Sequence, residues 1–163
     1  MTLIATLLGF LLPACGQQGA AGVAPVPFDY LSHFERPASP NSALAAPAGF
    51  TPKADITLGP YAVPAAMLAA DLRAVALAAP RTYQLAASAD GLDLQFVARS
   101  AIANFPDIVI ARISSLGENE SNLILYSHSI YGYGDFGVNR KRLTQWLTAL
   151  DQRLPPEARL KGQ

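Results

Sequence analysis

Two stretches of the chain repeat apolar residues at the spacing of an α-helix. One covers residues 63–79 and ends at Pro80, and the other covers about residues 136–154 and ends before Pro155. The apolar positions are Met67, Leu68, Leu72 and Val75 in the first stretch, and Leu143, Trp146, Leu147, Leu150 and Leu154 in the second. Each stripe predicts a helix that buries one face.

Four runs between these helices have the residue pattern of β-strands. They cover residues 82–88, 92–100, 107–115 and 122–131. Ala89-Asp90-Gly91 and Gly117-Glu118-Asn119-Glu120 have the composition of hairpin turns, and the connections are too short for crossover helices. We therefore expect an α+β fold of two layers: an antiparallel four-stranded sheet flanked by two helices, in the order α-β-β-β-β-α.

The last of these strands carries apolar residues on both of its sides. Leu123 and Leu125 alternate with Ile124 and Tyr126, so neither face of the sheet is plainly exposed to solvent. Three interpretations stay open for the second face: cover by a Pro-rich segment, a ligand groove, or a surface for a partner.

The part of the chain before residue 63 lacks such periodicity and divides by composition. Prolines recur through residues 28–62, which excludes long helices and predicts an extended segment that wraps the domain. Residues 16–27 are rich in Gly, Ala and Pro and predict a flexible tether. Residues 63–154 then form the α+β core domain, and residues 155–163 form a tail.

Residues 1–15 are uncharged and mostly apolar, which is typical of an export signal. The apolar run is shorter than the ~20 residues that cross a bilayer. Leu12-Pro13-Ala14-Cys15 resembles a bacterial lipobox, in which Cys15 is the residue that receives the lipid. The alternatives are a signal peptide cleaved among residues 14–22, which gives a soluble exported protein, and an uncleaved anchor.

Composition narrows the classes of protein to which the chain can belong. The 163 residues include 12 Lys plus Arg against 12 Asp plus Glu, and 51% are hydrophobic, which excludes general disorder and argues against nucleic-acid binding. Cys15 is the only cysteine, so the chain has neither an internal disulfide nor a Cys-x-x-Cys pair. We expect no cofactor and no metal.

A Gly-rich connection precedes the last predicted helix. Gly132-Tyr133-Gly134-Asp135-Phe136-Gly137 matches the dinucleotide pattern G-x-G-x-x-G, but too few residues follow it for the remaining strands of that fold. The other interpretation is a tight turn in which Asp135 caps the helix. Arg140, Lys141 and Arg142 then fall in its first turns, where one interpretation is a binding site for a phosphate or an acidic lipid headgroup. The alternative is a solvated face in which Asp135 or Asp107 pairs with one arginine.

Ser127, His128 and Asp107 offer a hydrolase as a further alternative. Adjacent strand residues point to opposite faces, so a hydrogen bond between Ser127 and His128 is geometrically poor. No G-x-S-x-G elbow supports it, and His33 lacks the spacing of a metal ligand.

Several motifs together resemble a known family. Residues 132–142 match G-Y-x-D-x-G-x-N-R-x-R, the signature of the domain of unknown function 1499 (DUF1499) family. Ser39-Pro40-Asn41 is similar to the S-P-N segment of that family, and Arg99-Ser100 and Phe105-Pro106-Asp107 are similar to its R-S and F-P-D elements. The chain departs from the family pattern at Arg36 and Ser42, where many members have cysteines, and at Ser127-His128-Ser129, where S-R-S is common.

The resemblance implies a bacterial, often membrane-associated or lipoprotein-like domain with no established activity. It suggests that Asp135, Asn139, Arg140 and Arg142 brace the connection between strand and helix. The same residues equally predict a small polar pocket, shared with Arg99, Ser100, Asp107, Ser127 and His128.

We therefore expect an exported domain of the bacterial cell envelope, facing the periplasm, that acts as a binding or interaction module. Its expected partners are the membrane, through a lipid on Cys15, and an envelope protein or small anionic ligand.

Overall fold

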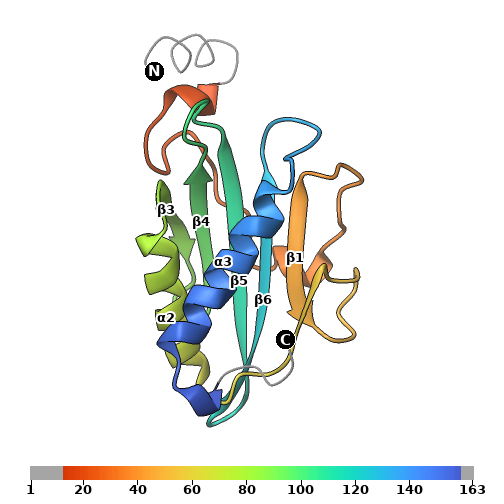
Figure 1. The fold of residues 1–163 in the computed structure, drawn as a ribbon, viewed down its shortest axis with the longest axis vertical. Helices are drawn as coiled ribbons and strands as arrows, with labels where there is room; N and C mark the ends of the chain where they lie inside the picture. Colours follow the sequence, from red (N-terminus) through yellow and green to blue (C-terminus); the bar gives the residue numbers. More distant parts are fainter. Residues whose placement is uncertain (1–12, 159–163) are drawn as a thin grey trace.

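A computed structural model describes residues 13–158 and shows an α+β fold with one six-stranded sheet (Figure 1). Within these residues the two α-helices are α2 (Ala65–Ala78) and α3 (Val138–Arg153). The strands are β1 (Ser42–Pro47), β2 (Ile56–Leu58), β3 (Thr82–Ala87), β4 (Asp93–Arg99), β5 (Pro106–Gly117) and β6 (Glu120–Ser129). The described residues also include three short 3₁₀ helices: η1 (Pro13–Gly16), η2 (Tyr30–His33) and η3 (Pro156–Ala158).

The sheet order is β2-β1-β6-β5-β4-β3, which makes the prediction of four antiparallel strands wrong. The four predicted strands are present as β3 to β6, but β1 and β2 add two more from the Pro-rich segment. β1 runs antiparallel to β6, and β2 runs parallel to β1, so the sheet is mixed. The sequence did not predict β1 because half of Ser42–Pro47 is alanine and the strand holds no β-branched or aromatic residue, the usual signal of a strand.

Both helices cover one face of the sheet, and Figure 1 shows α3 crossing it. Phe96 of β4 meets Trp146 of α3 edge to face, with 5.6 Å between ring centroids. The second face carries its own apolar cluster, in which Leu31 and Phe34 lie over Tyr126 of β6. The segment before β1 therefore covers much of the second face.

Hydrogen bonds fasten that segment to the sheet. The buried Gln95 side chain of β4 accepts from the Val26 N–H at 2.9 Å and donates to the Val26 carbonyl at 2.7 Å. Residues 16–27, whose composition predicts a tether, thus run along the sheet in the structure. Side chains of β4 and of the loop after it hold these residues against the sheet by hydrogen bonds to their main chain. Composition does not reveal such contacts.

The two edges of the sheet are irregular. β2 has three residues and leads toward Pro60, and β3 shifts register between Gln84 and Ala86. Within residues 13–158, no helix is both long and apolar enough to span a membrane.

Candidate functional site

Asn139, at the start of α3, is the centre of a polar cluster between α3 and the ends of β1 and β6. Its side chain is fully buried. The Nδ2 atom donates to the Asn41 carbonyl at 2.9 Å and to the Ser129 hydroxyl at 3.0 Å, and Oδ1 accepts from the Ser127 hydroxyl at 2.5 Å. One amide therefore ties the helix to two neighbouring strands.

Arg142 extends this cluster to β5. Its Nη2 atom lies 2.6 Å from Asp107 Oδ2, and both side chains are largely buried. The Nη1 atom donates to Ser127 Oγ and to Asn139 Oδ1. The guanidinium thus neutralises a buried carboxylate and also saturates the Asn139 acceptor.

Asp135 caps α3 from the preceding loop. Its carboxylate accepts from the backbone N–H groups of Gly137 and Asn139 at 2.8 and 2.9 Å, and from Asn139 Nδ2 at 2.8 Å. Burial acts to raise the pKa of Asp135, but these hydrogen bonds outweigh it, and the pKa lies below its usual value. The Asp135 carboxylate therefore already accepts from the backbone N–H groups at the start of α3, where an external anion would otherwise bind. Arg140 remains exposed beside it.

Asn41 joins the same cluster from the segment before β1. Its side chain donates to the Gly132 carbonyl at 2.8 Å, and its Oδ1 accepts from Ser39. The motifs S-P-N, F-P-D and G-Y-x-D-x-G-x-N-R-x-R, far apart in the sequence, thus meet in one hydrogen-bonded network. The family described as Protein of unknown function (DUF1499) matches residues 34–150. The chain belongs to the DUF1499 family. No curated protein and no solved structure matches the chain.

The opposite face of this DUF1499 sheet holds Arg99, which binds the main chain of the N-terminal segment. Its guanidinium donates to the carbonyls of Ala14, Gly19 and Ala21 at 2.7 to 2.8 Å. Asn104, in the loop between β4 and β5, donates to the carbonyls of Cys15 and Gln17. We call these contacts the carbonyl clamp, because they hold residues 14–21 through backbone oxygens alone.

Cys15 is fully buried beneath the clamp. Burial raises the pKa of its thiol above the usual value, and the nearby Arg99 charge opposes the rise. The thiol in this position is protonated and shielded, which is unfavourable for any reaction at Sγ.

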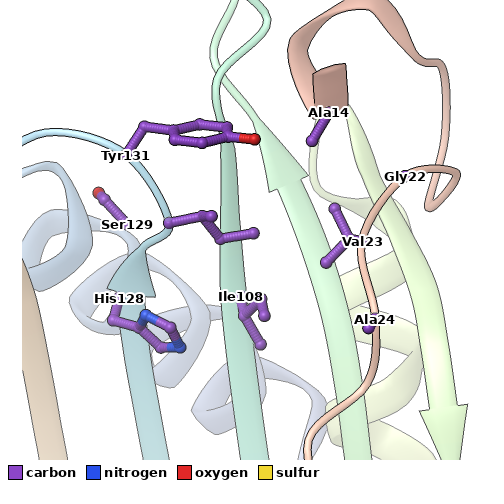
Figure 2. Close-up of a pocket in the computed structure, with 9 residues that line it drawn as sticks. Ala14, Gly22, Val23, Ala24, Ile108, His128, Ser129 and Tyr131 are labelled. Carbon is purple, nitrogen blue, oxygen red and sulfur yellow. The ribbon is translucent and has the colours of Figure 1, made fainter. Parts of the chain in front are cut away.

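A groove of about 360 Å³ opens next to the clamp (Figure 2). The N-terminal segment forms one wall, the end of β6 forms the other, and Ile108 of β5 lies between them. The lining residues are Ala14, Gly22, Val23, Ala24, Ile108, His128, Ser129, Ile130 and Tyr131. Gly22 has φ +75°, and a Cβ there would lie 2.8 Å from Gln17, so this wall needs a glycine.

His128 supplies a polar atom beside the groove. Its Nε2 atom is buried and has no hydrogen-bond partner in the described part of the chain. The ring stacks on Tyr126, with 5.3 Å between centroids. Burial lowers the pKa of His128 below 6.5, against smaller opposing effects of the Ser129 backbone and the Asp107 charge. The imidazole is therefore neutral at pH 7.

The structure separates the predicted site residues into two groups. It gathers Asp107, Ser127, Asp135, Asn139 and Arg142 on the helix side of the sheet. Arg99 and His128 lie on the other face, and Ser100 closes the β4–β5 loop by accepting from the Phe105 N–H. Ser127 and His128 face opposite sides of the sheet, so the hydrolase alternative has no direct hydrogen bond between these two side chains.

Sequence reasoning did not identify Asn41 or Asn104 as site residues, nor the apolar lining of the groove. Side chains alternate between the two faces of the sheet along β6, so the sequence was sufficient to place Ile130 on the same face as His128. Among residues 13–158, no group of three His, Cys, Asp or Glu side chains is arranged to hold a metal ion.

We expect Arg142→Met to lower the free energy of unfolding by about 3–5 kcal/mol, because it leaves the Asp107 carboxylate buried without its partner. Denaturant titration measures this change. Arg140→Met, the same substitution two residues away on an exposed side chain, is the control and should change stability by less than about 0.5 kcal/mol. The double variant Asp107→Asn/Arg142→Met should lose less than the two single changes combined. Equal losses at residues 140 and 142 would show that the Arg142–Asp107 ion pair does not stabilise the domain.

His128 should also make stability depend on pH. Because its folded pKa lies below the unfolded value of 6.5, the unfolded chain binds the proton more readily. The free energy of unfolding therefore falls as pH decreases from 6.5 toward the folded pKa. His128→Gln should reduce this slope between pH 7 and 5, whereas His33→Gln retains His128 and should preserve it. Denaturant titrations at several pH values measure the slope, and an unchanged slope in His128→Gln would refute the assignment.

Proposed function

We propose that this DUF1499 protein is an exported, lipid-anchored binding module of the bacterial cell envelope, and that the groove beside His128 is its ligand site. The observation that carries the proposal is a mostly apolar groove lined by His128, whose buried Nε2 atom has no hydrogen-bond partner among residues 13–158. The polar cluster on the helix side is a weaker candidate, because its members already satisfy one another.

The lining defines the ligand class. A volume of about 360 Å³ lies near the lower end of the range for small-molecule pockets, roughly 300–1,000 Å³. Val23, Ile108 and Ile130 favour an apolar body, and a neutral imidazole offers one hydrogen bond. We therefore propose a small, mainly apolar ligand that carries one hydroxyl or carboxyl group directed at His128.

Lipid attachment at Cys15 is compatible with most of the carbonyl clamp. Cleavage before Cys15 would remove Ala14 and its bond to Arg99, but Arg99 would keep the carbonyls of Gly19 and Ala21. The Cys15 side chain would have to leave its buried position to carry the lipid. Because Ala14 also lines the groove, the same cleavage would widen the ligand site.

Titration with 1-octanol tests the groove. We expect saturable shifts in the NMR signals of the His128 ring and the Ile108 methyl groups. His128→Phe keeps a flat ring but removes the nitrogens, and should weaken binding about tenfold, the equivalent of one hydrogen bond. His33→Phe, at an exposed position, is the matched control and should bind as the unmodified protein does. Unsaturable shifts, or equal affinity in His128→Phe, would remove the groove as the ligand site.

Expression in a bacterial host tests the anchor. The mature protein should begin at Cys15, carry the added mass of acyl chains, and partition into detergent. Cys15→Ala should lack that mass and leave the detergent phase. If mass and partition are the same in both proteins, Cys15 does not carry a lipid.

A further inference from the structure

Two loops at the end of the sheet where the described chain begins expose large apolar side chains. Ile102 lies between β4 and β5 and is 73% exposed, whereas Tyr133 and Phe136 lie between β6 and α3 and are 77% and 104% exposed. The loops are neighbours, because the rings of Phe105 and Tyr131 lie 6.4 Å apart. Figure 1 shows both loops at the end that carries η1.

The folded domain gains nothing from the Phe136 ring. The ring buries no surface, and the backbone at this residue has φ +53°, a conformation that residues with a Cβ disfavour. Packing within the domain therefore does not account for a phenylalanine at this loop tip. An apolar environment outside the domain accounts for this residue.

The charge around the loops is positive. Arg140 and Lys141 are exposed in the first turn of α3. The nearby carboxylates are engaged internally, Asp135 with the amides of α3 and Asp107 with Arg142. Glu118 and Glu120 lie at the opposite end of the sheet, in the β5–β6 hairpin. The end with exposed apolar residues is thus also the end that attracts anions.

The start of the described chain lies at this same end. Asn104, from the β4–β5 loop, holds the Cys15 carbonyl at 2.7 Å. A membrane that holds a lipid on Cys15 would therefore face the two loops.

We propose that residues 100–105 and 130–141 form a membrane-docking face. Ile102, Tyr133 and Phe136 insert among the lipid chains of an anionic bilayer, and Arg140 and Lys141 contact the phosphate groups. The proposal deepens the envelope location given above but does not depend on the groove. The membrane contact is then made by the protein itself, in addition to any lipid on Cys15.

Site-specific labelling tests the orientation. In the full chain carrying Cys15→Ala, an environment-sensitive fluorophore is placed on Gly134→Cys in the docking face or on Asn119→Cys in the opposite hairpin. With vesicles of phosphatidylglycerol and phosphatidylcholine, the label at residue 134 should shift to shorter wavelength and be quenched by spin-labelled lipid. The label at residue 119 should not respond. Equal responses at both positions would overturn the proposal.

Binding measurements test the residues in the same Cys15→Ala background. Ile102→Ser/Phe136→Ser should weaken vesicle binding at least about tenfold, since two large apolar groups are lost. Arg140→Gln/Lys141→Gln should weaken binding about tenfold on anionic vesicles but not on neutral ones. Leu116→Ser, at an exposed position in the opposite hairpin, is the matched control and should bind normally.

Two results would overturn the docking face. One is unchanged vesicle binding by Ile102→Ser/Phe136→Ser. The other is a dimer, detected by sedimentation velocity, that Phe136→Ser abolishes, because it would assign the loops to a second copy of the chain. Neither result bears on octanol binding or on the mass of the mature protein, so failure here is distinguishable from failure of the proposed function.

Discussion

The buried amide of Asn139 is the interaction on which this end of the domain depends. A carboxamide donates and accepts at once, so a single side chain can satisfy a carbonyl from the segment before β1, two hydroxyls on β6 and the cap of its own helix. Neither a charged nor an apolar residue of similar size can do this. The cost of burying the amide is offset only while all these partners stay in place, which fixes β1, β6 and α3 relative to one another.

That constraint divides the sheet into two sides with different roles. The helix side is closed, because the Arg142–Asp107 ion pair and the Asn139 amide are satisfied internally and its apolar residues are covered by α2 and α3. The other side is assembled from the N-terminal segment, which Gln95 and the carbonyl clamp hold through main-chain atoms. Contacts to backbone carbonyls place few demands on the side chains of that segment. Small residues there are consistent with a firmly bound segment as well as with a loose one.

The pattern of residues within each element was sufficient to predict those elements that have a clear periodicity or turn motif. Both helices, four strands and the cap by Asp135 follow from periodicity, turn residues and a short polar side chain before a helix. The remainder depends on contacts between distant residues. Asn41 and Asn139 are 98 positions apart, and nothing near Asn41 indicates an acceptor for a buried amide. β1 is rich in alanine and is defined by its pairing with β6, and the groove exists only after the N-terminal segment has folded back onto the sheet.

The irregular margins of the sheet restrict how other molecules can approach it. A three-residue outer strand followed by a proline offers too few free amides to guide an incoming β-segment, and the register shift in β3 bends the opposite margin out of alignment. Extension of the sheet by an added strand is therefore disfavoured at both margins. This protects the protein from edge-to-edge aggregation and leaves recognition to its loops and to the segment laid across it.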